Sequence, residues 1–224
     1  MNKSTPEIER MVRDIEYQIP LASGVLGRDT LDRRVLAAMR KVPRHEFVPA
    51  DEVPYAYDDG PLPIGCGQTV SQPFIVALMT DLLRTRPDHV VLEVGTGSGY
   101  QSAVLSQLVK QVYSTEIHCE LADKARERLS RLAYRNVEIR CGDGYFGWRE
   151  FAPFDGIIVT AAAPHVPPPL VEQLKPGGRL LIPLGWPHLP QELLLLEKGV
   201  DGQVTSRDVL SVAFVPLTGE HPAV

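Results

Sequence analysis

The sequence has few cysteines, no long apolar run and no excess of positive charge. Its three cysteines, Cys66, Cys119 and Cys141, are widely spaced and include no C-x-x-C pair. We therefore expect three reduced thiols, as is typical of a cytoplasmic protein, and no zinc or redox motif. No apolar run approaches the ~18 residues that a membrane-spanning helix needs. The first 20 residues also lack the apolar stretch of a signal peptide. Cytoplasmic localisation without membrane association is therefore expected.

The charge balance argues against nucleic acid as a partner. The 224 residues include 23 Lys and Arg against 28 Asp and Glu, so the formal net charge is −5. A protein that binds nucleic acid without sequence preference needs a basic face to neutralise phosphates. With 44% hydrophobic residues, the chain has enough apolar side chains for an ordinary globular core.

The order of apolar patterns predicts a doubly wound α/β protein. Apolar side chains at helical spacing, interrupted by prolines, indicate helices before residue 60. Later, short β-rich runs alternate with amphipathic helical stretches, which favours a parallel sheet covered on both faces. Two final strands separated by "GVDGQ" must be antiparallel. We predict a mostly parallel seven-stranded sheet with a C-terminal antiparallel hairpin, in one domain whose regions are 1–60 (helical), 61–72 (loop), 73–185 (core) and 186–224 (terminal strands).

A glycine-rich turn, "EVGTGSGY" at residues 93–100, follows the first predicted strand of the core. Its spacing is Gly95-x-Gly97-x-Gly99, so the third glycine comes one residue earlier than in the dinucleotide fingerprint. Glu93 precedes the turn and would oppose a diphosphate. The turn therefore favours a ligand that has a cationic group and lacks phosphate.

Two further acids follow the next two predicted strands. Glu116 and Asp143 lie where parallel strands end, which is where open α/β sheets bind their ligands. An acid after the second strand can accept the hydroxyls of an adenosine ribose. Adenosine with a positive charge and no phosphate describes S-adenosylmethionine. The alternative is that these acids are solvated loop residues beside a tight turn.

Several motifs together resemble one family. "LPIGCGQTVSQP" (62–73) is similar to the signature loop of the protein-L-isoaspartate O-methyltransferases, and "VLEVGTGSGYQSAVL" (91–105) is similar to their cofactor loop. "APFDGIIVTAAAP" and "LKPGGRLLIPLG" follow in the family's order. The resemblance implies methyl transfer from S-adenosylmethionine, which becomes S-adenosylhomocysteine, to isoaspartyl residues of damaged proteins and peptides. The segment before Leu31 is longer than in the shortest bacterial members, and an extension of this kind could alter substrate access.

The resemblance also implies roles for individual residues. Ser71 matches the serine that is usually assigned to the active site. The cofactor would be bound by Glu93, Gly95, Thr96, Gly97, Ser98, Gly99, Glu116, Ile117, Asp143 and Gly144. The substrate cleft would be lined by Gln68, Thr69, Val70, Val212 and Val215.

The chemistry of such a transfer asks little of the protein. A carboxylate with a pKa near 4 is already ionised at neutral pH, so it needs no general base. A sulfonium leaving group needs no proton and no metal. Ser71 and Thr69 then serve as hydroxyl donors, whereas a serine nucleophile would need an adjacent base. Alternatively, Ser71 caps the helix that Pro73 begins. Cys66 is expected to be a small turn residue.

Three rival functions remain on the sequence alone. The first is a methyltransferase of this fold with another acceptor, such as a different carboxylate or a biosynthetic peptide. The second is a nicotinamide dehydrogenase, against which the glycine spacing and Glu93 argue. The third is a cofactor-binding scaffold without turnover. We expect a monomer that acts on isoaspartyl proteins and peptides, without a metal.

Overall fold

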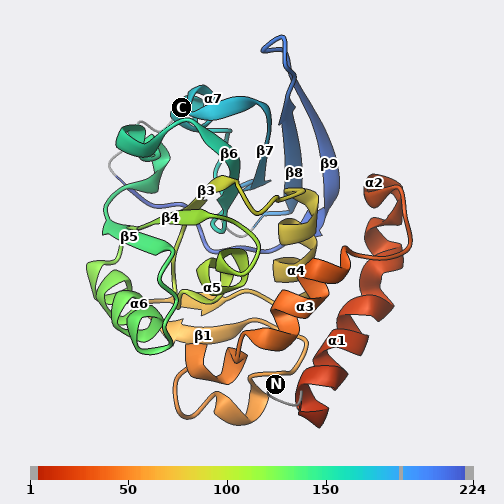
Figure 1. Ribbon diagram of the computed structural model, residues 1–224, viewed down its shortest axis with the longest axis vertical. Coiled ribbons are helices and arrows are strands. Elements are labelled where there is room, and N and C mark those ends of the chain that lie inside the picture. Colours follow the sequence, from red (N-terminus) through yellow and green to blue (C-terminus); the bar gives the residue numbers. More distant parts are fainter. Residues whose placement is uncertain (1–4, 187–188, 220–224) are drawn as a thin grey trace.

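The computed structural model describes residues 5–186 and 189–219 and has a seven-stranded sheet at its centre (Figure 1). The order of the strands is β5-β4-β3-β6-β7-β8-β9. The first five of these pair in parallel, while β7–β8 and β8–β9 pair antiparallel. The strands are β3 (Val90–Val94), β4 (Gln111–Glu116), β5 (Val137–Cys141), β6 (Phe154–Val159), β7 (Leu174–Leu184), β8 (Gln191–Lys198) and β9 (Val204–Val212). The predicted mostly parallel sheet with an antiparallel C-terminal hairpin is confirmed.

The sheet separates two apolar cores because successive side chains of a strand point to opposite faces. Val91 and Ile158 pack into one core, and their neighbours Leu92 and Ile157 pack into the other. All four side chains are fully buried. The larger core lies under α1 (Pro6–Gln18), α3 (Arg33–Lys41), α4 (Pro73–Leu82), α5 (Tyr100–Ser106) and α6 (Cys119–Arg131). The smaller core lies under α7 (Pro168–Glu172) and under Trp148, which lies between η4 (Gly144–Phe146) and η5 (Arg149–Phe151).

The N-terminal quarter is helical, as the apolar spacing predicts. Pro6 occupies the first turn of α1, where its missing N–H costs no hydrogen bond. After η1 (Ile19–Ala22) and α2 (Ser23–Leu26), the chain enters α3, and η2 (Arg44–Phe47) and η3 (Val53–Tyr55) follow. Asp32 caps α3, because its carboxylate accepts the Arg34 N–H at 2.8 Å.

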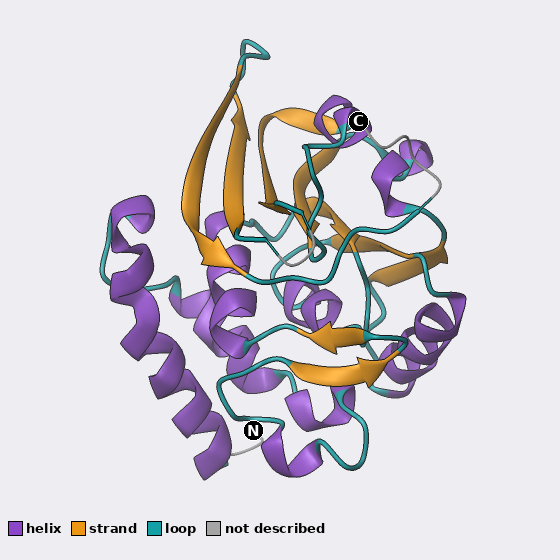
Figure 2. Ribbon diagram, turned by 180° about the vertical axis from the view of Figure 1, so that it is seen from behind, coloured by secondary structure: helices purple, strands orange, loops and turns teal. Residues whose placement is uncertain are grey.

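Residues 61–72 contain a short hairpin that composition alone did not indicate. Strands β1 (Leu62–Gly65) and β2 (Gln68–Val70) pair antiparallel and form a small sheet separate from the main one (Figure 2). Cys66 and Gly67 make the turn with positive φ angles of 52° and 70°. The predicted loop is therefore an ordered turn with Cys66 at its exposed tip.

The expectation of three reduced thiols is wrong for two of them. Cys119 and Cys141 form a disulfide whose Cα atoms are 5.1 Å apart. Their 22-residue separation hides this proximity in the sequence. It arises because β4 and β5 are parallel neighbours, so the residue that begins α6 after β4 lies beside the residue that ends β5. Cys66 is free and exposed.

Candidate active site

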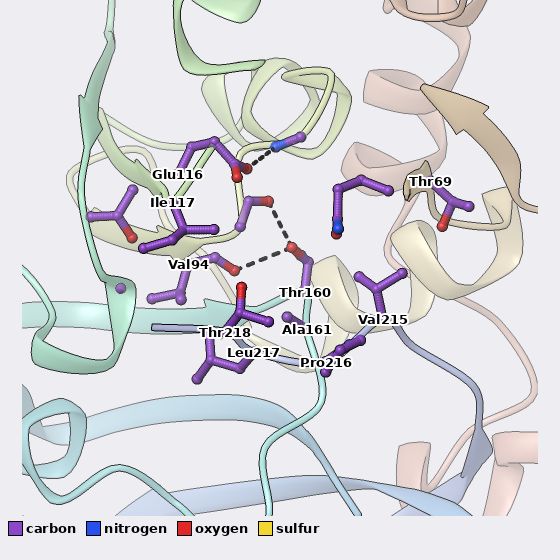
Figure 3. A pocket seen from close by; sticks show the side chains of 15 residues that line it. Thr69, Val94, Glu116, Ile117, Thr160, Ala161, Val215, Pro216, Leu217 and Thr218 are labelled. Carbon is purple, nitrogen blue, oxygen red and sulfur yellow. Dashed lines mark hydrogen bonds between the residues drawn. The ribbon is translucent and has the colours of Figure 1, made fainter. Parts of the chain in front are cut away.

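The candidate site lies at the carboxyl ends of β3, β4 and β6. Strand order runs from β3 through β4 to β5 on one side, while β6 lies on the other side of β3. Ligands of open α/β sheets bind at such a reversal. Figure 3 shows the cavity there. Its walls are formed by Gln68, Thr69, Val94, Gly95, Gly97, Thr115, Glu116, Ile117, Gly144, Thr160, Ala161, Val215, Pro216, Leu217 and Thr218.

The glycine turn is held by Thr160, the residue that follows β6. Thr160 Oγ1 donates to the Gly95 carbonyl oxygen at 2.7 Å, drawn as a dashed line in Figure 3. Gly95 has a φ of 98°, and a Cβ there would collide with the Thr160 side chain, so glycine is required at this position. Gly99, in contrast, lies outside the cavity wall. A Cβ at this position would contact Leu129 of α6. Gly99 packs two helices together.

Glu116 forms the polar centre of the cavity wall. Its side chain is 5% exposed, and its two oxygens accept hydrogen bonds from the Gly97 and His118 N–H groups at 2.7 and 3.0 Å. Ile117, which is 37% exposed, lines the outer part of the same wall. Gly144 faces them from η4, where a Cβ would collide with Val94 and Thr115. A flat ring system could therefore approach the backbone closely between Ile117 and Gly144.

Glu93 lies beneath the turn and not on the cavity wall. It is fully buried, and its Oε2 accepts hydrogen bonds from Ser102 and Ser114. Its Oε1 has no hydrogen-bond partner among the residues that the structure describes. Burial raises the pKa of Glu93 to about 8. Its sequence neighbour Val94 lines the cavity, since adjacent strand residues point in opposite directions.

Asp143 also acts on the backbone next to the cavity. Its Oδ1 accepts the Tyr145 N–H at 2.9 Å and so caps η4. The carboxylate lies against Gly219 of the C-terminal segment, where a Cβ would collide with it. Asp143 thereby fixes the turn that presents Gly144 to the cavity.

An apolar groove of about 510 Å³ adjoins the cavity. Thr69 and Thr160 line both, so they mark the place where the two spaces meet. Ser71 lies in the groove wall opposite β9 and the segment after it, which contribute Val212, Phe214 and Val215. Val70, Ser71, Thr96 and Ser98 also line a small pocket between the groove and the glycine turn.

Ser71 does not cap α4, although the sequence allowed that role. The N-cap of α4 is Gln72, and no side chain caps this helix end among the described residues. The backbone of Ser71 is held instead, because Arg44 donates to its carbonyl oxygen at 2.8 Å. Arg44 is fully buried, also bonds the Ala56 carbonyl oxygen at 2.8 Å, and lies over the Tyr100 ring at 4.7 Å.

Several residues of this region were not predicted from the sequence, among them Thr160, Arg44, Gln18 and Leu21. Thr160 directly follows β6, so the rule that ligands bind at strand ends could have found it. Arg44 gives no such signal, because its partners are backbone carbonyl groups distant in sequence. Gln18 and Leu21 line the groove from α1 and η1, and their approach depends on helix packing alone.

No group of three side chains suited to a metal ion occurs among residues 5–186 and 189–219. Within the same residues, no helix is long and apolar enough to cross a membrane.

Comparison with known proteins identifies the family. The model of the family "Protein-L-isoaspartate(D-aspartate) O-methyltransferase (PCMT)" matches residues 26–222. The chain belongs to this family. The resemblance read from the signature loop and the cofactor loop is thereby confirmed.

Curated relatives of this methyltransferase family match the chain over nearly its full length. A protein-L-isoaspartate O-methyltransferase 2 from Polaromonas sp. is 61% identical over 215 residues, which cover 96% of this chain and 99% of that protein. One from Syntrophobacter fumaroxidans is 59% identical, covering 95% of this chain and 86% of that protein.

Solved structures of the family share the fold. A protein-L-isoaspartate O-methyltransferase with 29% identity aligns with a TM-score of 0.81 over 95% of this chain and 66% of its own. A putative member from Plasmodium falciparum, solved in complex with S-adenosyl-L-homocysteine, has 25% identity and a TM-score of 0.73. It aligns over 90% of this chain and 98% of its own.

Proposed function

We propose that this chain transfers the methyl group of S-adenosylmethionine to the free carboxylate of L-isoaspartyl residues, and of D-aspartyl residues, in damaged proteins and peptides. The observation that carries the proposal is the junction at Thr69 and Thr160, which line both the cavity and the groove. A cofactor in the cavity and a peptide in the groove would meet there. Methylation begins repair because it activates the misplaced carboxyl group.

The residues of the cavity fit the cofactor. The buried Glu116 carboxylate is placed to accept the two ribose hydroxyls, and Ile117 and Gly144 leave room for the adenine ring. Gly95 and Gly97 allow the methionine part to approach the backbone, with Thr96 and Ser98 nearby. Glu93, Gly99 and Asp143 would affect cofactor binding indirectly, because they hold the turns from outside the cavity wall. When bound, the cofactor supplies a methyl group on a sulfonium.

The protein's part in the reaction is to orient the substrate carboxylate and to exclude water. The substrate carboxylate is ionised at neutral pH and attacks without a base. Thr69 and Ser71 would donate hydrogen bonds that aim one oxygen at the methyl carbon. Gln68, Val70, Val212 and Val215 would form the walls around them. Alignment of this kind can supply on the order of 7–11 kcal/mol of barrier reduction.

We further propose that the chain acts as a single-domain monomer in the cytoplasm. The edges of the sheet support a monomer, because Glu138 on β5 and Arg207 and Asp208 on β9 place charges on the two edge strands. Charged side chains on edge strands disfavour pairing with another copy. The net charge of −5 and the absence of a membrane-spanning helix among the described residues are compatible with localisation in the cytoplasm.

The test is methylation of an isoaspartyl peptide, compared with the same peptide containing ordinary aspartate. We expect an ester on the first peptide only. Ser71→Ala should lower kcat on the order of 10- to 100-fold, because a hydrogen bond to a charged group contributes about 1.5–3 kcal/mol. Its affinity for S-adenosylhomocysteine should hardly change. Ser206→Ala, on the exposed part of β9, is the matched control.

Two outcomes would contradict the proposal in different ways. If the protein binds S-adenosylhomocysteine and leaves the isoaspartyl peptide unmodified, the acceptor is another compound. If Ser71→Ala keeps the full rate, Ser71 has no part in the transfer.

A further inference from the structure

The disulfide lies between the two turns that shape the nucleoside side of the cavity. Cys119 begins α6, three residues after Glu116, and Cys141 ends β5, three residues before Gly144. Glu116 and Gly144 both line the cavity. The covalent bond thus joins the turn after β4 to the turn after β5 directly beside the site.

The sheet beneath does not depend on this bond. Strands β4 and β5 pair along five consecutive residues, from Val112↔Val137 to Glu116↔Cys141. The Gly142 N–H also donates to the Glu116 carbonyl oxygen at 2.8 Å. Residues Leu121, Ala125 and Leu129 bury the inner face of α6. Opening the disulfide therefore leaves the strands and the helix in place and releases only the two turns.

The bond is open to reagents in solution. Cys119 is exposed and Cys141 is half-buried, in contrast to a disulfide enclosed in the core. Cys119 is the first residue of a 13-residue helix. The positive end of the helix dipole stabilises a thiolate leaving group there, which favours exchange. Disulfides of cytosolic proteins are usually transient and catalytic or redox-sensing.

We propose that Cys119 and Cys141 form a reversible thiol–disulfide site that controls cofactor affinity, and that small disulfides and dithiols are its reactants. In the oxidising direction, one cysteine thiolate attacks a small disulfide and releases one small thiol. The second cysteine thiolate then attacks the mixed disulfide and releases the other thiol. In total, two protein thiols and one small disulfide give the protein disulfide and two small thiols. A dithiol reverses the reaction and is itself oxidised to a cyclic disulfide.

The oxidised form is the one with the higher affinity. The disulfide restricts the two turns before the ligand arrives, so less conformational freedom is lost on binding. In the reduced form, the turn that carries Ile117 and the turn that carries Gly144 can separate. The inference rests on the proposed function, because it takes the nucleoside of S-adenosylmethionine as the ligand of these turns.

Cys66 provides the matched control. Its Sγ lies 3.9 Å from Glu120 Oε2, so the free thiol at the hairpin tip is close to the residue after Cys119. Cys66→Ser removes the exposed free thiol and keeps the disulfide. Cys119→Ser/Cys141→Ser removes the disulfide and keeps Cys66.

The experiment measures S-adenosylhomocysteine binding by calorimetry in two states of the full chain. One sample is equilibrated with oxidised glutathione and the other with dithiothreitol, and each is freed of reagent before titration. Mass spectrometry and thiol titration verify the state. We expect one free thiol in the first and three in the second, with about tenfold weaker binding after reduction, a typical size for a coupling between sites.

The variants decide between outcomes. Cys119→Ser/Cys141→Ser should bind weakly in both samples, whereas Cys66→Ser should respond like the parent protein. Equal affinities in both states, or three free thiols after oxidation, would overturn the redox site while methylation of the isoaspartyl peptide continued. Absence of S-adenosylhomocysteine binding in every sample would overturn the proposed function together with this inference.

Discussion

Side chains in the cavity wall and behind it hold the backbone of the site in place. Thr160 bonds the carbonyl oxygen of Gly95, and Arg44 bonds that of Ser71. Each contact fixes the conformation of a turn. The residues of these turns are small and make few packing contacts themselves. Arg44 can do this only from a buried position, where its guanidinium also rests on Tyr100 at the start of α5. The groove wall and the glycine turn are thus connected through one side chain.

The buried Glu93 predicts a pH dependence of stability. Burial raises its pKa from 4.5 to about 8, so the folded protein keeps a proton that the unfolded chain releases between these values. Stability then falls as the pH rises through this window, by at most about 1.4 kcal/mol per pH unit. Glu93→Gln keeps an acceptor for Ser102 and Ser114 and cannot ionise. Its unfolding free energy should therefore decline less between pH 5 and pH 8.

Urea unfolding at pH 5, 6, 7 and 8 measures this difference. Glu150→Gln, which changes an exposed carboxylate, is the control and should follow the parent protein. Parallel pH profiles for Glu93→Gln and the parent would mean that Glu93 is not the group responsible.

At the scale of elements, regular patterns were readable from the sequence and close contacts between distant segments were not. Strands β3 and β6 were predictable because a strand that is buried on both faces is mostly apolar, although β3 also contains the buried Glu93. The β1–β2 hairpin was missed, since prolines and glycines mask its three pairs of residues. The disulfide and the wall contributed by α1 were missed because each depends on packing between segments far apart along the chain.

The α1–η1 segment extends the apolar groove beyond residues 26–222, which the family model matches. Leu21 and Gln18 line the groove, yet both precede residue 26, where the family match begins. Gln18 is tied to both ends of the segment 59–72, because its Nε2 donates to Asp59 at 2.6 Å and its Oε1 accepts from Gln72 at 3.2 Å. Leu21 is 69% exposed and offers apolar surface to a bound peptide.

We therefore predict that Leu21→Asp selectively weakens binding of isoaspartyl peptides with apolar flanking residues. Partial burial of a leucine contributes about 1 kcal/mol, so KM should rise roughly fivefold while kcat is retained. A peptide with glycines beside the isoaspartate should be unaffected. Tyr17→Asp is the control, since Tyr17 is 87% exposed on α1 and lies outside the groove. Equal changes in KM for both peptides, or the same effect in Tyr17→Asp, would refute a specific subsite.

At the scale of the whole molecule, the site joins parts that are far apart in sequence. Its walls come from the β1–β2 hairpin, the ends of β3, β4 and β6, and the segment after β9. The Ala162 N–H donates to the Val215 carbonyl oxygen at 2.8 Å, which attaches that last segment to the strand ends. A ligand that contacts all these parts should stabilise the fold as a whole.

Thermal unfolding with S-adenosylhomocysteine measures this linkage. Ligand at 100 times its Kd adds about 2.7 kcal/mol to the free energy of unfolding. For a chain of this size, 1 kcal/mol raises Tm by about 2–4 °C, so the expected increase is roughly 5–10 °C.

Asp143→Ala should reduce the increase in Tm, because loss of the cap on η4 frees Gly144, while Asp143→Asn keeps the acceptor and should preserve the increase. Ser71→Ala should show the full increase, because the proposed partner of Ser71 is the acceptor carboxylate and not the cofactor. A full increase in Asp143→Ala would mean that the η4 turn needs no cap to bind the nucleoside.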